Sequence, residues 1–324
     1  MLASVNTQYG PPEVIKIQEI KKPVPKDSEL LIKVYASTVN RTDCGFRSAE
    51  YFISRFFSGL LKPKFKVLGN EFSGEIVEVG GNVNMFKVGE RVFGYDEVNF
   101  GSHAEYKVIA QSGSIVTMPD NLSYLEAAPV CEGAHYALCI IRAAKVTKGQ
   151  NVLVYGATGG IGSAGVQLLK YFGAHVTAVC HANHLNIVNS LGADQVIDYT
   201  SQDYTNTETK YDFVFDSVGK TSFGKCKPAL SAEGIYISTE LGKNWENIFL
   251  ALKGKLTKGK RVLFPLPTID KSDVEFLKEL VVTGKFKPLM DRVYPLHEIV
   301  DAYRYVETGQ KLGNVVIQIQ KQTN

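Results

Sequence analysis

Residues 151–173, Asn-Val-Leu-Val-Tyr-Gly-Ala-Thr-Gly-Gly-Ile-Gly-Ser-Ala-Gly-Val-Gln-Leu-Leu-Lys-Tyr-Phe-Gly, contain a strand pattern, a glycine turn and a helix pattern in immediate succession. Glycines at 156, 159 and 162 allow a sharp turn and a close approach to phosphate groups, and the N–H groups that open the helix favour negative charge. A glycine triplet alone also fits a simple tight turn, so the strand and helix around it support the prediction of a dinucleotide site. The expected contacts are Gly156, Thr158, Gly159, Gly160, Ile161 and Gly162.

Length and composition are those of an ordinary globular protein with two domains. The chain has 324 residues, of which 44% are hydrophobic and 21% charged. Its 36 basic and 33 acidic residues are spread along the chain, so the charge pattern favours a small-molecule ligand over nucleic acid or a membrane surface. Without a leader pattern or a membrane-length apolar run, the expected compartment is the cytoplasm. The five cysteines form no C-x-x-C pair and are expected to be free thiols.

Periodicity divides the chain into three parts. Up to about residue 117, alternating β-branched runs separated by glycine and proline predict mostly strands. From about residue 123, strand and helix patterns alternate, beginning with a helix expected to run to about residue 144. This alternation predicts βαβ units and a parallel sheet of the α/β class. The C-terminal part returns to mixed structure and ends in a strand over residues 314–319.

Several longer motifs resemble those of one family. They are the segments 36–43 (ASTVNRTD), 68–75 (LGNEFSGE), 77–92 (VEVGGNVNMFKVGERV), 191–194 (LGAD), 215–219 (FDSVG) and 313–316 (GNVV). Together with the glycine turn they make the chain similar to the medium-chain dehydrogenase/reductase superfamily. Within it, the chain resembles the zinc-free NADPH quinone oxidoreductase branch, whose members are zeta-crystallin-like.

The resemblance implies an architecture and an assembly. A GroES-like β-rich catalytic domain is expected from residues 1–122 and 267–324. A Rossmann NADP(H)-binding domain with a doubly wound parallel sheet is expected over residues 123–266, and the active site is expected in the cleft. It also implies a homodimer in which the last Rossmann strand, near residues 261–265, pairs with its two-fold mate. An exposed apolar edge strand needs covering, which gives this expectation a physical basis.

Two asparagines distinguish the chain from zinc-dependent relatives. Those relatives place a cysteine where this chain has Asn40 and a histidine where it has Asn70, while the third ligand position falls near Cys131. Amides are poor zinc ligands, and Glu71 with one thiol does not complete a typical site. The segment 94–115 also lacks the four cysteines of a structural zinc site. We therefore expect no metal.

A metal-free site limits the chemistry. Oxidising an unactivated alcohol requires stabilisation of an alkoxide, which zinc supplies as a Lewis acid. An electron-poor acceptor, such as a quinone or an α,β-unsaturated carbonyl, instead gives a delocalised anion that a few hydrogen-bond donors stabilise. The alternatives are an NADP-dependent alcohol dehydrogenase and a non-catalytic NADPH-binding protein.

Asn40 is the first catalytic candidate. By resemblance it faces the substrate and either donates to the substrate oxygen or holds the nicotinamide ribose, whereas its plain alternative is a turn asparagine after the strand 30–37. Tyr51 and Tyr95 are candidate donors to a developing oxyanion, or simply walls of the cleft. Relatives carry a tyrosine near position 45 or 46, and its absence here leaves water or the cofactor ribose to protonate the product.

Two further segments stay open to alternatives. In residues 129–136 relatives often place a threonine that faces the nicotinamide amide, and Cys131, Glu132 or His135 could take that role. His135 is equally compatible with a helix packing face. The aromatic run over residues 51–57, with Leu60 and Leu61, has helical spacing and is interpreted as domain core in preference to a substrate lid.

The second βαβ strand predicts the cofactor. It ends in Val179-Cys-His-Ala-Asn-His184, and no carboxylate follows before Asp194, so nothing in the sequence nearby repels a 2′-phosphate. His181 and Asn183 could bind that phosphate, so NADPH is the expected cofactor. The resemblance adds cofactor contacts from Asn40, Cys131, Cys180, Tyr199, Ser217, Val218, Ser238 and Asn314.

Overall fold

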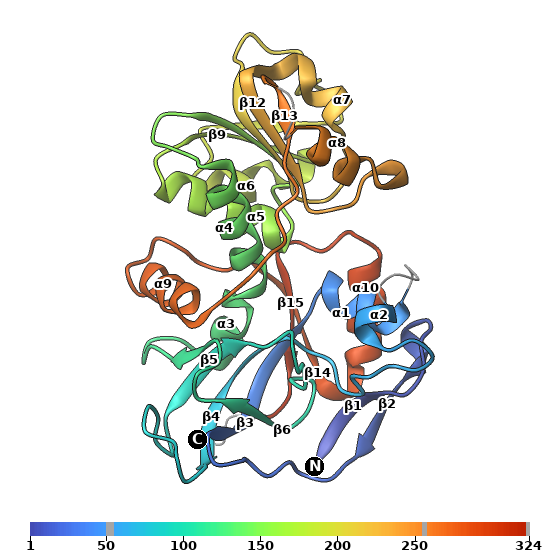
Figure 1. Ribbon diagram of the computed structural model, residues 1–324. Coiled ribbons are helices and arrows are strands. Elements are labelled where there is room, and N and C mark those ends of the chain that lie inside the picture. The colour runs from blue at the N-terminus through green and yellow to red at the C-terminus, as the bar shows by residue number, and fades with distance from the viewer. Residues whose placement is uncertain (50–54, 255–257, 322–324) are drawn as a thin grey trace. The chain divides into compact units, whose positions relative to one another are not determined.

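The structure is a computed structural model that describes residues 1–49, 55–254 and 258–321 (Figure 1). The chain forms two compact units. Unit 1 contains residues 1–132, 269–282 and 290–324, and unit 2 contains residues 133–268 and 283–289. Tyr51 lies outside the described residues.

Unit 1 is built on a seven-stranded sheet in which the last strand of the chain joins strands from its first third. The order is β14-β15-β3-β4-β5-β7, and β6 pairs with β3. The strands are β3 (Glu29–Val39), β4 (Glu71–Val79), β5 (Arg91–Tyr95), β6 (Tyr106–Ala110), β7 (Ile115–Thr117), β14 (Met290–Pro295) and β15 (Asn314–Gln318). A separate hairpin pairs β1 (Leu2–Asn6) with β2 (Ile15–Glu19).

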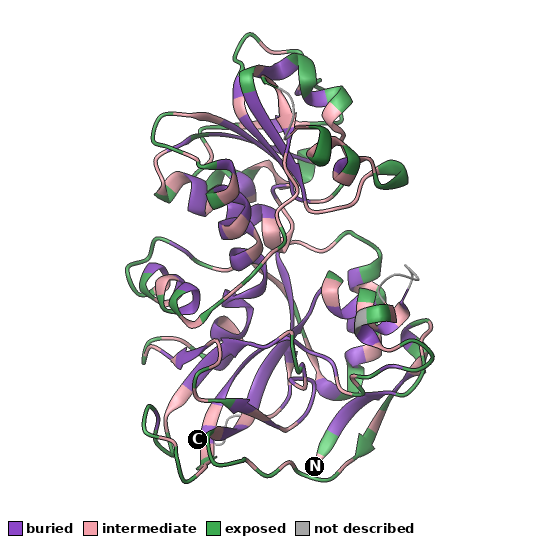
Figure 2. Ribbon diagram, viewed as in Figure 1, coloured by how far each residue is buried: buried purple, intermediate pink, exposed green. Residues whose placement is uncertain are grey.

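The core of unit 1 lies between this sheet and an amphipathic C-terminal helix. Leu30, Ile32 and Phe72 of the sheet cluster with Tyr303 and Val306 of α10 (Ile299–Glu307), and all five are fully buried. Figure 2 shows the sheet strands as mainly buried. The other helices of this unit are α1 (Arg41–Ser48), α2 (Arg55–Ser58), α3 (Tyr124–Ala127) and α9 (Lys271–Val282).

Unit 2 contains a six-stranded parallel sheet with the order β10-β9-β8-β11-β12-β13. The strands are β8 (Asn151–Tyr155), β9 (His175–Cys180), β10 (Gln195–Asp198), β11 (Tyr211–Asp216), β12 (Leu230–Ser238) and β13 (Arg261–Val262). The helices are α4 (Glu132–Ala144), whose first residue still belongs to unit 1, α5 (Gly160–Tyr171), α6 (Leu185–Ser190), α7 (Phe223–Cys226) and α8 (Glu246–Gly254). The strand order reverses direction at β8, which confirms the predicted doubly wound α/β sheet.

Two local predictions are wrong, and one predicted strand is present but shorter than expected. The helix predicted from about residue 123 to 144 is divided, because Pro129 adopts a non-helical conformation between α3 and α4. The strand near residues 261–265 is shorter, and Pro265 cannot donate to a ladder. Phe56, Leu60 and Leu61 are 68%, 52% and 86% exposed, so these members of the aromatic segment are not domain core.

Among the described residues, no helix combines the length and apolarity needed to span a bilayer.

Candidate active site

In the glycine turn of unit 2, an added Cβ atom would fit at one glycine and would clash at two others. Gly156 has φ of +83°, in the left-handed region, and a Cβ there would lie 2.6 Å from Val218 Cγ1. A Cβ on Gly162 would lie 2.2 Å from the Gly156 carbonyl oxygen. At Gly159, which caps α5 without a side-chain bond, the nearest atom would be 3.7 Å away. The fold therefore requires Gly156 and Gly162, whereas Gly159 leaves the helix N-terminus open.

The hydroxyls of Ser217 and Ser238 bond to the protein itself. Ser217 Oγ donates to the carbonyl oxygens of Tyr155 (2.8 Å) and Gly156 (3.1 Å), so it supports the glycine turn. Ser238 Oγ donates to the buried Asp216 carboxylate at 3.2 Å. The N–H group of Val218 also donates to Asp216. These residues stand at the ends of β11 and β12, and their contact with a cofactor stays a prediction.

The end of β9 gathers the residues expected to bind the 2′-phosphate. Cys180 is buried, whereas Asn183 is exposed and its N–H group donates to Nδ1 of His181. The ring of His181 lies 6.0 Å from that of Tyr199, which is 47% exposed. Four residues from this part of the chain thus come together in the same unit.

No carboxylate precedes Asp194 in the sequence, but the fold brings a later one, Asp198, beside the end of β9, so the expectation that no charge here repels a 2′-phosphate does not hold. β10 pairs with β9 so that Asp198 lies beside Cys180, and the backbone of Ala182 hydrogen-bonds to the Asp198 carboxylate. The same carboxylate accepts from Thr200 and Ser201. These hydrogen bonds hold the pKa of Asp198 below its ordinary value. The sequence near β9 could not predict this carboxylate, because the neighbouring strand β10 supplies it.

In unit 1, Asn40 marks the point where β3 passes into α1. Its Oδ1 accepts from the N–H group of Asp43 at 3.0 Å, and Asp43 Oδ2 accepts from the N–H group of Asn40 at 3.1 Å, which forms a capping box. Asp43 is fully buried and its other oxygen accepts from the N–H group of Gly69. Asn40 therefore begins a helix and does not merely close a turn.

The Asn40 amide continues into a buried hydrogen-bond chain. Asn40 Nδ2 donates to Asn70 Oδ1 at 2.8 Å, and Asn70 Nδ2 donates to Glu132 Oε2 at 2.6 Å. Thr42 Oγ1 donates to the other oxygen of Glu132 at 2.8 Å. Asn70 Nδ2 also reaches Tyr95 Oη at 3.5 Å, so the structure brings Asn40 and Tyr95 into one cluster.

A second buried carboxylate, that of Glu71, bonds to the backbone of Glu132. Glu71 accepts from the Thr38 hydroxyl at 2.6 Å and from the N–H groups of Cys131 and Glu132 at 3.1 and 2.8 Å. Burial, followed by the nearby charge of Glu71, raises the pKa of Glu132 to about 8. Burial likewise raises the pKa of Glu71 to about 7. Burial lowers the pKa of Lys311, whose charge is favoured by Glu132.

These residues do not fit a zinc ion. The amides of Asn40 and Asn70 bond to each other, and the Glu71 carboxylate is occupied by three donors. Burial raises the pKa of the Cys131 thiol well above its ordinary value, which disfavours the thiolate that zinc prefers. Over the described ranges, no group of three or more histidine, cysteine, aspartate or glutamate side chains is arranged to hold a metal.

The remaining candidates lie in different surroundings. Asn314 begins β15 in unit 1 and is buried. His135 belongs to unit 2, where burial lowers the pKa of its imidazole to about 3 and keeps it neutral. Sequence reasoning missed the link from Glu132 to Thr42 and Asn70, although it singled out the unusual segment around Glu132.

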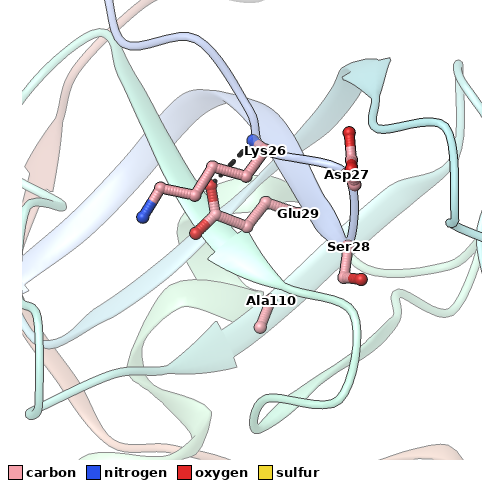
Figure 3. A pocket seen from close by; sticks show the side chains of 5 residues that line it. All are labelled: Lys26, Asp27, Ser28, Glu29 and Ala110. Carbon is pink, nitrogen blue, oxygen red and sulfur yellow. Dashed lines mark hydrogen bonds between the residues drawn. The ribbon is translucent and has the colours of Figure 1, made fainter.

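The hollow in Figure 3 lies elsewhere in unit 1. It is lined by Lys26, Asp27, Ser28, Glu29 and Ala110. The backbone of Lys26 donates to Glu29 at 2.9 Å across its edge, and none of the predicted site residues lines it. It has no part in the candidate site.

Comparison with known proteins gives consistent matches. Residues 26–120 match the alcohol dehydrogenase GroES-like domain family, and residues 191–317 match the zinc-binding dehydrogenase family. A chloroplastic quinone-oxidoreductase homologue of Spinacia oleracea is 33% identical over 95% of both chains. A 2-methylene-furan-3-one reductase of Solanum lycopersicum is 32% identical over 96% of this chain and 77% of its own. A chloroplastic NADPH-dependent alkenal/one oxidoreductase of Arabidopsis thaliana is 30% identical over 98% of this chain and 79% of its own.

A solved structure agrees with the sequence matches. The quinone oxidoreductase from Coxiella burnetii superposes with a TM-score of 0.87 and 28% identity, covering 99% of each chain.

The expected cytoplasmic location is wrong. The spinach relative and two from Arabidopsis are named as chloroplast proteins, and a related oxidoreductase of Mus musculus is named as mitochondrial. These relatives point to an organelle.

Proposed function

The chain belongs to the medium-chain dehydrogenase/reductase superfamily, in the quinone oxidoreductase branch, and we propose that it reduces a quinone or an α,β-unsaturated carbonyl with hydride from NADPH. The observation that carries this proposal is the buried amide pair Asn40–Asn70, which supplies hydrogen-bond donors in a cluster that does not fit zinc. The names of the spinach, tomato and Arabidopsis relatives support it, and they do not favour the alcohol dehydrogenase alternative.

Bound NADPH supplies the hydride. The N-terminus of α5 at Gly159 and Gly160 would hold its pyrophosphate through backbone N–H groups. His181, Asn183 and Tyr199 would hold the 2′-phosphate side of the cofactor.

The substrate oxygen accepts from Asn40. Nδ2 of Asn40 carries two hydrogens, one of which it donates to Asn70. The other hydrogen stabilises the enolate or hydroquinone anion that the substrate becomes. Tyr95, whose hydroxyl donates to Glu97 at 2.5 Å, lies behind Asn70 and supports this arrangement.

The functional experiment is a turnover screen of the purified protein. NADPH and NADH oxidation is followed by absorbance with a panel of quinones and 2-alkenals. The proposal expects rapid turnover with at least one acceptor and a preference for NADPH. Saturable NADPH binding without turnover would instead indicate a non-catalytic binding protein.

The protein is also proposed to be zinc-free and homodimeric. β13 lies at the end of the parallel sheet, so its outer edge is available to a two-fold mate. Metal analysis of the active protein tests the first statement, and a stoichiometric zinc content would contradict it. Light scattering tests the second, and a monomeric mass would contradict it.

A further inference from the structure

We infer that Glu132 is a positioning residue that fixes the orientation of the Asn40 amide through Asn70. The inference rests on the proposed function, because Asn40 is there the donor to the substrate oxygen. Glu132 is one of the three residues, with Cys131 and His135, among which the sequence left the choice open. Asn40, Asn70 and Glu132 all belong to unit 1.

The partners at the two ends of the hydrogen-bonded series Asn40–Asn70–Glu132 determine where the oxygen and nitrogen of each amide lie. At one end, the N–H group of Asp43 can only donate, so it holds Oδ1 of Asn40 at 3.0 Å. At the other end, Oε2 of Glu132 accepts from Nδ2 of Asn70 at 2.6 Å. Oδ1 of Asn70 must then face Asn40, which presents Nδ2 at 2.8 Å. The Asp43 end and the Glu132 end therefore require the same orientation of the two amides.

The role of Glu132 does not depend on its charge. As a carboxylate it accepts from Asn70 and from Thr42. As a carboxylic acid it still accepts from Asn70 through one oxygen and donates to the Thr42 hydroxyl through the other. An amide at this position can do the same, whereas an apolar side chain leaves Nδ2 of Asn70 only the longer contact to Tyr95 Oη at 3.5 Å.

Burial makes the orientation costly to change. Asn70 is fully buried, and Asn40 and Glu132 are 6% and 5% exposed, so water does not readily replace a lost partner. The backbone of Glu132 is itself held by Glu71 at 2.8 Å. Without the Glu132 acceptor, Asn70 is free to turn its oxygen away from Asn40, and the second hydrogen of Asn40 loses its direction toward the substrate.

The experiment compares Glu132→Gln with Glu132→Leu. We expect kcat of the Gln variant within about threefold of the original protein, because its oxygen still accepts from Asn70. We expect kcat of the Leu variant to fall about tenfold to a hundredfold, with substrate KM and NADPH Kd little changed, because orientation of a transition-state donor is lost. A matched control is Glu307→Leu, which removes the partner of the buried Arg47 in the same unit. It should lower Tm without lowering kcat.

Several outcomes overturn the inference. Unchanged kcat in Glu132→Leu shows that Asn40 is oriented without Glu132. An equal loss of kcat in Glu132→Gln shows that charge, and not acceptor geometry, is what matters. If the original protein turns over no quinone or alkenal, the proposed function fails instead, so the two failures are distinguishable.

A second variant keeps the test decisive if Glu132→Leu does not fold. The double variant Asn70→Asp with Glu132→Gln exchanges donor and acceptor between the two positions. The introduced glutamine amide then donates to the introduced aspartate carboxylate, which still accepts from Asn40. We expect its kcat within about fivefold of the original. A folded double variant, judged by Tm, whose kcat is at least about a hundredfold lower would overturn the inference.

Discussion

At the scale of single residues, three buried carboxyl groups bear on how the stability of unit 1 responds to pH. Glu71, Glu132 and Asp43 are buried, and burial raises the pKa of each above its ordinary value. They are retained because backbone and side-chain donors satisfy their oxygens. A buried carboxyl group whose pKa is raised makes the free energy of unfolding depend on pH.

The first prediction concerns pH and stability. A carboxyl whose pKa is about 8 when folded and 4.5 when unfolded binds protons more strongly in the folded state, so the free energy of unfolding falls as pH rises between these values. Burial lowers the pKa of His103 from 6.5 to about 4 and that of His135 from 6.5 to about 3, so these two groups oppose this trend only below pH 6.5. From pH 6.5 to about 8, we expect Tm to fall.

Glu132→Gln supplies the control for this prediction. It should lessen the fall, so that its Tm relative to the original protein is higher at pH 8 than at pH 6.5. Parallel Tm curves for the two proteins, measured in one buffer series, would contradict the assignment.

A second residue-scale prediction concerns cofactor choice. Asp198 lies beside the residues expected to hold the 2′-phosphate, so its charge opposes that phosphate. Asp198→Asn should tighten NADPH binding about threefold to tenfold relative to NADH, as read from Kd values by fluorescence titration. The control His181→Ala should shift the ratio in the opposite direction. Unchanged ratios in both variants would place the phosphate elsewhere.

At the scale of elements, the turn from β8 to α5 contains two glycines that the fold requires and one, Gly159, where a Cβ atom would fit. Gly162→Ala places a Cβ against the Gly156 carbonyl and should lower Tm by several degrees. Gly159→Ala meets no atom closer than 3.7 Å and should leave Tm nearly unchanged. If Gly159 faces the pyrophosphate, the same change should weaken NADPH binding at least about tenfold. Undiminished NADPH affinity in folded Gly159→Ala would refute this site.

At the scale of the whole molecule, the proposed function assigns the cofactor to unit 2 and the substrate oxygen to unit 1. The parallel sheet of unit 2 carries the glycine turn, and the mixed sheet of unit 1 carries the amide chain. Because no step requires a metal, prolonged dialysis against a chelator should leave kcat and Tm unchanged. Loss of activity that added zinc restores would contradict this prediction.

How much could be predicted from sequence differs between elements. The glycine turn and the parallel sheet depend on short segments whose period and spacing are visible directly, and both were predicted. The break between α3 and α4 at Pro129 and the exposure of Phe56 depended on packing that a periodic pattern does not specify. Asn40 was identified as a candidate, but its partners were not.

The sequence by itself determined the parallel sheet of βαβ units, the β-rich character of the N-terminal part and the glycine turn, because each follows from local period and conformational freedom. Only the tertiary structure joined Asn40 to Asn70, Asn70 to Glu132, and Thr42 to Glu132, pairs separated by 30, 62 and 90 residues. Only strand pairing brought Asp198 beside Cys180. Contacts of this kind depend on which strands become neighbours, and that is decided by the burial of whole faces and not by any short segment.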